Sequence, residues 1–390
     1  MKNNSRTVWI DYLRGFITLL VVAHHSSLAY TTFASFDKAA YSNSTHPIVD
    51  RYRWVGLDIF EDFNDIFFMS LMFLISGIFV IKGLNRGTKL YLKERFYRLF
   101  IPFLIGVCIL MVIAHYPAFL LAYGKGDLKD YLVDFFTIES WPVGPPWFIW
   151  VLFAFNIIIT ILYPYLKHSI TTLSLKINNL KNSPLKVLLV FYSLTWILYL
   201  PMMLSFGSGT WKGIGPFDFQ VSRILLYFGY FSLGVIIGGI KIEEGLFGDT
   251  SELFRKPILW ILGCISVYAI VKVIELPLET MISRNILTIF QATLLYRSVW
   301  TFSCSLSCLA FLVLFKRLFN HPTDWWQSLS SNAYGIYLIH YIFVLWCQYE
   351  LLDANIPAFG KFMITFCISF SVSWYITFLF RKLKFVQRYL

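Results

Sequence analysis

The feature that most constrains this chain is a series of about ten apolar segments that recur along its whole length. A helix needs about 20 apolar residues to cross the hydrocarbon core of a bilayer. The pattern therefore predicts an all-α polytopic membrane protein of about ten transmembrane helices, forming one integral-membrane domain over 1–390 with no fused extracytoplasmic domain. The predicted spans lie at 10–30, 64–81, 99–122, 147–166, 187–204, 221–240, 257–276, 299–315, 333–352 and 362–380.

The composition excludes a soluble protein as the default. Hydrophobic residues make up 57% of the chain and charged residues 14%, against about 45–50% and about 25% in average soluble proteins. The formal net charge is +11, but Lys and Arg stand in short clusters between the apolar runs. That placement is typical of membrane proteins, so we expect the lipid bilayer as a partner and no nucleic acid.

Counting Lys and Arg by side predicts the orientation. The N-terminal segment and the loops after every second span carry 21 of the 33 basic residues, and the opposite loops carry 8. Basic residues accumulate in cytoplasmic loops, so both termini are predicted to be cytoplasmic. The stretch 277–298, on the outside, is the least regular, and we expect a loop there with an interfacial or re-entrant helix.

The first predicted span carries charges that need an explanation. Arg14 and His25 are eleven residues apart, which is three helical turns plus about 20°, so they share one face about 16 Å apart along the axis. A charge at the bilayer centre costs about 2.5–3.5 kcal/mol. A simpler interpretation is that Arg14 reaches the interface and pairs with Asp11, while His25 is an interior histidine with a hydrogen-bond partner. His24 points about 100° away, and we interpret it as structural.

A basic segment follows the second predicted span. Arg95 and Arg98 lie one turn apart, where we expect the third span to begin. Arginine suits bidentate contacts to phosphate, and a helix N-terminus would add amide donors for an anion. The alternative is ordinary cytoplasmic positive charge.

Two further residues stand out in the apolar background. Trp147 follows two prolines that suit a first helical turn, and it is either an interfacial anchor or a substrate contact. His340 is expected in the inner half of the ninth span, where a lone histidine is either packed and hydrogen-bonded or functional.

The six cysteines all fall within apolar segments. Cys304 and Cys308 have helical spacing, but no histidine or second cysteine pair lies near them in sequence. We interpret the six as packing residues and expect neither a metal site nor a disulfide.

Together these motifs resemble the acyltransferase-3 superfamily of membrane acyltransferases, over nearly the whole chain. The motifs that carry the resemblance are Arg14-x10-His25, MFLISGIF at 72–79, Arg95-x-x-Arg98 followed by LFIP, PWFI at 146–149 and YGIYLIH at 334–340.

The resemblance implies that an acyl group, acetyl or succinyl, moves from cytoplasmic acyl-CoA to a hydroxyl of an extracytoplasmic glycan. It also implies a multi-pass protein of the cell inner (plasma) membrane, with acyl-CoA as co-substrate and no bound cofactor. Arg14 and His25 are then the catalytic pair, and Arg95 and Arg98 contact the CoA phosphates.

Histidine has a suitable pKa for taking a proton from a hydroxyl, so His25 is predicted to act as general base or as a covalent acyl carrier. Asp11 would orient Arg14, and Trp147 and His340 would contact substrate.

The competing class is a transporter or flippase of a glycan or anionic precursor, because intramembrane charges also mark transport pathways. Against it, the two halves of the chain show no internal repeat. The sequence does not predict an oligomeric state, since Gly234-x-x-x-Gly238 suits close helix packing within one chain or between two.

Overall fold

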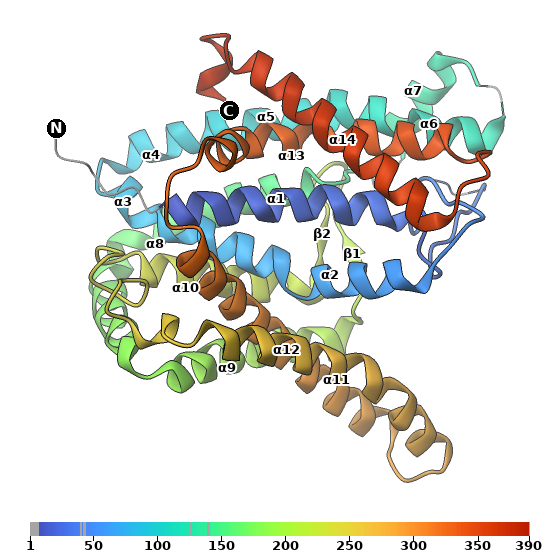
Figure 1. Cartoon of the computed structure of the whole chain (residues 1–390). Helices are drawn as coiled ribbons and strands as arrows, with labels where there is room; N and C mark the ends of the chain where they lie inside the picture. The colour runs from blue at the N-terminus through green and yellow to red at the C-terminus, as the bar shows by residue number, and fades with distance from the viewer. Residues whose placement is uncertain (1–7, 40, 42–43, 125, 139–140, 390) are drawn as a thin grey trace.

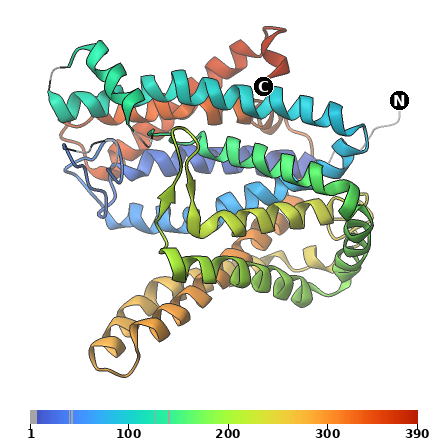
Figure 2. The ribbon, with the colours of Figure 1, turned by 180° about the vertical axis from the view of Figure 1, so that it is seen from behind.

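The computed structural model describes residues 8–39, 41, 44–124, 126–138 and 141–389. Long helices run roughly side by side, and a two-stranded hairpin lies across them on the face turned toward the viewer in Figure 2 (Figures 1 and 2). The longer helices are α1 (Val8–Leu28), α2 (Val55–Ile78), α6 (Met111–Tyr123), α8 (Trp147–Asn178), α9 (Pro184–Phe206), α10 (Ile224–Ile237), α11 (Pro257–Ser283), α12 (Ile289–Leu318), α13 (Asp324–Glu350) and α14 (Ala358–Phe380). The shorter elements are α3 (Val80–Leu84), α4 (Thr88–Arg95), α5 (Ile101–Ile105), α7 (Leu128–Thr137), β1 (Trp211–Lys212) and β2 (Phe219–Gln220), with π-helical turns at Phe96–Phe100 and Gly106–Leu110.

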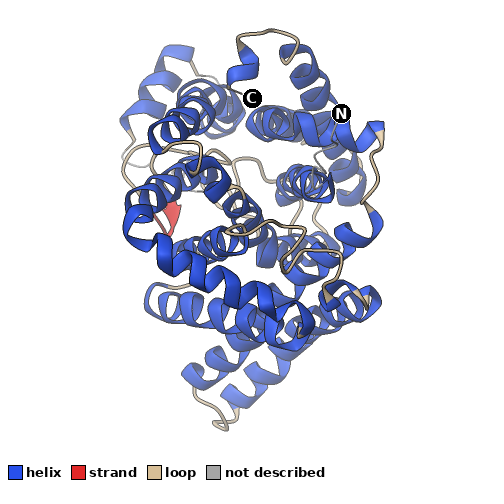
Figure 3. Ribbon diagram, turned by 90° about the vertical axis from the view of Figure 1, so that its left-hand side faces the viewer, coloured by secondary structure: helices blue, strands red, loops and turns tan. Residues whose placement is uncertain are grey.

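Apart from connecting loops and one short hairpin, the described structure is helical (Figure 3), and α1 and α2 each pack against several other helices. Helix α1 packs against α2, α12, α13 and α14, and α2 packs against α10 and α12 as well. Because α1 and α2 follow one another and run in opposite directions, the start of α1 lies beside the end of α2. This places Arg14 and Arg95 near one end of the bundle, and His25 toward the other.

Local signals in the sequence set several helix boundaries. Pro184 and Pro257 stand in the first turns of α9 and α11, where a missing N–H costs nothing. Helix α12 begins with a complete capping box, in which Thr288 and Gln291 satisfy each other's backbone N–H groups. Helix α9 ends at Gly207, whose φ of 80° suits glycine.

Seven helices among the described residues are long and apolar enough to cross a membrane. They include α2, α8, α9, α11, α12, α14 and the continuous helical stretch 88–123. Each predicted span falls largely within a helix, including those on α1, α10 and α13. The structure therefore confirms an all-α polytopic membrane protein.

The expectation of a loop with an interfacial or re-entrant helix at 277–298 is wrong. Helix α11 continues past Pro277 to Ser283, and α12 begins at Ile289, so the two form a helical hairpin that projects from the bundle (Figure 1). A proline removes one hydrogen bond near a helix end without stopping it, and Asn285 turns the chain with a φ of 55°.

Glycines allow α2 and α10 to approach closely. A Cβ added to Gly234 would collide with the carbonyl oxygen of Leu74, and one added to Gly238 with that of Ile78. The carbonyl of Phe231 leaves no room for a side chain at Gly77. The Gly234-x-x-x-Gly238 pattern thus serves packing within this chain.

The segment 29–54 covers the end of the bundle at which α1 finishes. It is held by an ion pair of 2.6 Å between Lys361 of α14 and Asp50, both with fully buried side chains. A buried charge is tolerated only when it is paired. This segment carries His46 over the end of α1.

Candidate active site

Two adjoining cavities enter the bundle at the end where α1 begins. The larger, here called the vestibule, has a volume of about 1170 Å³, and the smaller inner cavity about 330 Å³. They share the lining residues Arg14, Phe79, Arg98, Ser330 and Ser331. Their basic lining residues are Arg14, Lys82, Arg95, Arg98, Lys241 and Arg381.

Only two acidic residues, Asp11 and Glu243, are among the lining residues of these cavities. An excess of cations over anions in a cleft attracts and concentrates anionic ligands. The paired cavities are therefore suited to a molecule with several negative charges.

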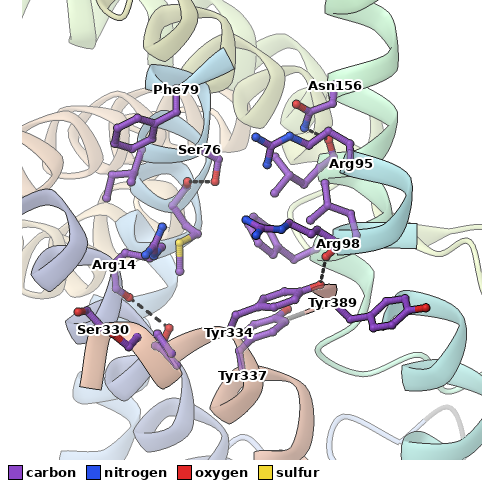
Figure 4. A pocket seen from close by; sticks show the side chains of 18 residues that line it. Arg14, Ser76, Phe79, Arg95, Arg98, Asn156, Ser330, Tyr334, Tyr337 and Tyr389 are labelled. Carbon is purple, nitrogen blue, oxygen red and sulfur yellow. Dashed lines mark hydrogen bonds between the residues drawn. The ribbon is translucent and has the colours of Figure 1, made fainter. Parts of the chain in front are cut away.

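Arg95 and Arg98 line the inner cavity together, as their spacing predicts (Figure 4). The Arg95 guanidinium lies 4.8 Å from the centre of the Tyr91 ring, and its Nε is buried without a hydrogen-bond partner. Neither arginine forms an ion pair with any residue in the described part of the chain. Both side chains are therefore available to an anion.

The helix that carries these arginines begins earlier than predicted. It starts at Thr88 and runs without a break to Tyr123, so Arg95 and Arg98 do not stand at a helix N-terminus, and the expected amide donors are absent from their side. A π-helical turn at Phe96–Phe100 widens the helix at Arg98 instead. Such turns occur frequently at functional sites.

Pro102 explains a hydrogen bond across the cavity wall. It has no N–H to donate to the carbonyl of Arg98, four residues earlier, so that carbonyl needs another donor. The hydroxyl of Tyr334 donates to it over 2.6 Å, as Figure 4 shows. Tyr334 and Tyr337, one turn apart on α13, both line the inner cavity.

Arg14 faces the two arginines from the opposite wall (Figure 4). It donates to Asp11 at 3.0 Å, which is the pairing expected from the sequence, and it lines both cavities. Its backbone carbonyl accepts from the hydroxyl of Thr18, also a lining residue. The Asp11 contact holds the Arg14 side chain at the mouth of the inner cavity.

His25 lies deeper than either cavity and pairs with His340. Its Nδ1 is 3.1 Å from Nε2 of His340, whose Nδ1 is 2.7 Å from the carbonyl oxygen of Tyr337. His25 keeps part of its surface exposed, whereas His340 is fully buried. The Tyr337 ring, at the inner cavity wall, is 6.0 Å from the His340 ring, so the chain of contacts runs from the cavity to His25.

This chain of hydrogen bonds fixes the tautomer of His25. A carbonyl oxygen only accepts, so the proton of neutral His340 lies on Nδ1 and its Nε2 is an acceptor. Nδ1 of His25 must then donate, which leaves a lone pair on its Nε2. The arrangement gives His25 an oriented basic nitrogen.

The position expected for His340 was wrong. Helix α13 begins at Asp324 rather than near residue 333, so His340 lies beyond the middle of the helix, level with His25. The nine residues before the predicted span, 324–332, form the first turns of α13.

Gln348 and His46, which no motif in the sequence marks, hold the end of α1. The Gln348 side-chain amide donates to the carbonyls of His25 and Ser26 at 3.1 and 3.3 Å, and His46 donates to its oxygen at 2.9 Å. The last carbonyls of a helix have no partner within it, so this is a C-terminal cap. Burial lowers the pKa of His46 to about 4.

Two other predicted residues lie outside the cavities. Trp147, in the first turn of α8, packs against Tyr227 and Trp211, with ring centres 5.7 and 5.5 Å away, while the next residue, Phe148, lines the inner cavity. His24 lies 3.8 Å from Glu61 of α2 and does not line either cavity.

Comparison with known proteins agrees with this architecture. The family model described as "Acyltransferase domain", of the acyltransferase-3 type, matches residues 7–378, and the chain belongs to this family of membrane acyltransferases. It is similar to glucans biosynthesis protein C of Shigella dysenteriae serotype 1, with 27% identity over 60% of this chain and 58% of that protein.

The protein of the same name from Escherichia coli O139:H28 is 26% identical over 64% of this chain and 62% of its own length. The chain thus spans about three fifths of the curated relatives it matches. No solved structure matches it.

Proposed function

We propose that this protein transfers an acyl group, acetyl or succinyl, from cytoplasmic acyl-CoA to a hydroxyl of an extracytoplasmic glycan. It would act as one membrane domain crossing the bilayer about ten times, with both termini in the cytoplasm of the cell and the bilayer concerned being the inner membrane. The observation that carries the proposal is an arginine-lined double cavity at one end of the bundle, connected by side-chain contacts to an oriented histidine.

The vestibule, together with the part of the inner cavity lined by Arg95 and Arg98, suits the head of CoA, which carries several phosphate groups. Arg95 and Arg98 would bind these phosphates bidentately, and Arg14 would contact the donor from the facing wall. The thin pantetheine arm would then enter the inner cavity toward Thr18 and Tyr337. The cytoplasmic side follows from the distribution of Lys and Arg between the loops.

His25 would serve as the general base. Its Nε2 takes the proton of the acceptor hydroxyl as that oxygen attacks the thioester carbonyl, so an O–C bond forms. The C–S bond then breaks, and the proton passes from Nε2 of His25 to the sulfur of the departing CoA. His340 is a positioning residue in this scheme, because it holds Nδ1 of His25.

The glycan acceptor is suggested by the names of the relatives and by the position of His25 toward the end of the bundle opposite the vestibule. Thus donor and acceptor would approach the histidine from opposite sides of the membrane. A transporter would need the same charged mouth but no base.

The test compares His25→Ala with His24→Ala in proteoliposomes supplied with labelled acyl-CoA and a glucan acceptor. His24 is a matched control, because it is an adjacent, buried histidine in the same helix. Loss of a general base typically costs 10²–10⁴-fold in rate, so His25→Ala should lose at least a hundredfold and His24→Ala only a few-fold.

Both variants should insert and melt like the parent protein. If both variants lose transfer activity equally and only mildly, His25 is not a catalytic residue. If neither the parent nor the variants transfer the acyl group, but glycan moves across the bilayer, the protein is a transporter and not an enzyme. A stable acyl adduct on His25, detected by mass after acid quench, would identify a covalent relay instead of a base.

A further inference from the structure

A third cavity, here called the distal pocket, lies at the end of the bundle opposite the vestibule. It has a volume of about 410 Å³ and lies between α2, α11, α12 and the β-hairpin that precedes α10. Its wall on α2 is formed by Asp62, Asp65 and Ile66, near the start of that helix, while Phe79 and Ser76 of the first two cavities lie near its end. The distal pocket therefore faces the other side of the membrane.

Each carboxylate that lines the distal pocket forms an ion pair with an arginine or lysine of the chain. Asp65 pairs with Arg223, Asp62 accepts from Lys272 at 2.5 Å, and Glu275 lies 3.5 Å from the same lysine. Glu275 also accepts from the hydroxyl of Tyr296 at 2.8 Å.

One cation in the distal pocket has no such partner. Arg297 makes no ion pair with any described residue, and its only hydrogen bond within that part of the chain is a long one of 3.5 Å to the hydroxyl of Tyr199. Its guanidinium lies 5.2 Å from the centre of the Tyr296 ring. In addition, Nε of Arg223, in a side chain that is 7% exposed, is buried without a partner. The Arg297 guanidinium is therefore the group available to an anionic ligand.

The remaining lining residues indicate the rest of that ligand. Tyr268, Tyr296 and Trp300 present aromatic surface, and Gln220 presents an amide. Sugar rings pack their C–H faces on aromatic rings, and their hydroxyls bind planar polar side chains. The Asp62 and Glu275 side chains are 42% and 43% exposed, so a ligand can reach the pocket from outside.

We propose that the distal pocket binds an acidic saccharide, with Arg297 contacting its carboxylate or phosphate group. The pocket lies near His25, because Asp65 on its wall is one helical turn from Glu61, which is 3.8 Å from His24, and the rings of His24 and His25 are 5.3 Å apart. The pocket would hold a sugar unit beside the one that reacts. This inference depends on the proposed function only in calling the saccharide the acceptor.

The test measures binding without acyl chemistry, in nanodiscs of zwitterionic lipid at low salt. The probes are laminarihexaose and the same hexasaccharide oxidised to carry a terminal carboxylate. The parent protein should bind the acidic probe at least tenfold more tightly than the neutral one, because a charge-assisted contact adds affinity. Arg297→Gln should abolish that preference, and Arg297→Lys should restore part of it.

Arg284→Gln is the matched control, since it removes the same charge from an exposed position at the tip of the α11–α12 hairpin. It should leave the preference unchanged. All variants should melt at the same temperature as the parent, which shows that they are folded.

Equal binding of the two hexasaccharides by the parent would overturn the proposal, as would an unchanged preference in Arg297→Gln. A soluble short-chain anionic phospholipid that binds as tightly as the acidic probe, through Arg297, would make the pocket a lipid headgroup site and also overturn it. If the protein binds the saccharide but transfers no acyl group, only the proposed function is refuted. If Arg297→Gln transfers the acyl group with an unchanged KM for the saccharide, only the assignment of the distal pocket is refuted.

Discussion

Replacing Arg95 and Arg98 by glutamine tests the donor end of the site most directly. Neither guanidinium is engaged by a carboxylate in the described structure, so each is expected to donate hydrogen bonds to a phosphate. A hydrogen bond to a charged group contributes about 1.5–3 kcal/mol, or roughly ten- to a hundredfold in affinity. Each single variant should weaken acyl-CoA binding by that factor.

The structure predicts different folding costs for the two arginines. Arg98 is exposed and uses only its backbone carbonyl to bind Tyr334, so Arg98→Gln should leave the melting temperature unchanged. Arg95 is half-buried over Tyr91, and Arg95→Gln should cost a small amount of stability as well as affinity. The side-chain amide retains much of the volume of each arginine but not its charge.

The assay is calorimetric titration of purified protein with acyl-CoA at two salt concentrations. Lys93→Gln is the matched control, because Lys93 is an exposed cation two residues before Arg95 and does not line either cavity. The arginine variants should also show a weaker salt dependence, since exposed charge interactions are screened by salt. If Lys93→Gln weakens binding as much as the arginine variants do, the contact is general positive charge and the phosphate site is refuted.

Three further predictions address stability and topology. Because burial lowers the pKa of folded His46 to about 4 from about 6.5 in the unfolded chain, the unfolded state binds more protons between these values. The free energy of unfolding should therefore fall by up to about 3 kcal/mol as pH drops from 6.5 to 4, and His46→Gln should flatten that slope in thermal melts; an unchanged slope would contradict it. Gly234→Ala should destabilise the protein by about 3 kcal/mol or more, because a backbone carbonyl blocks the added methyl. The control Gly263→Ala meets only a leucine side chain and should cost little stability. Equal melting temperatures of the two variants would contradict close packing of α2 and α10. Cysteines introduced at the exposed residues Lys38 and Lys89 should react with impermeant reagents from opposite sides of the membrane, and labelling from one side would refute the predicted orientation.

The sequence predicted the positions of residues within one helix better than the contacts between residues of different helices. Helical spacing brought Arg95 and Arg98 to one cavity, and it placed Arg14 at the mouth and His25 deeper on the same helix. These relations lie within single helices, where 3.6 residues per turn is sufficient to derive them.

Contacts between helices were harder to predict from the sequence. The bond from Tyr334 to the carbonyl of Arg98 joins residues that are 236 positions apart. Pro102 signals that this carbonyl needs a donor, but the sequence does not identify the donor. Similarly, the pairing of His25 with His340 depends on where α13 begins, and helix starts are the least certain part of any such prediction.

Because Tyr334 donates to the carbonyl that Pro102 leaves without a donor, α13 has a second role: it fixes the spacing between two parts of the site. The helix contacts the carbonyl of Arg98 through Tyr334 and the imidazole of His25 through His340, six residues or about 9 Å further along its axis. Inserting one residue between them would rotate one contact by about 100° relative to the other and lengthen the interval by about 1.5 Å. In the proposed mechanism, helix α13 would therefore set, in whole residues, how far the head group of the donor lies from the nitrogen that takes the proton.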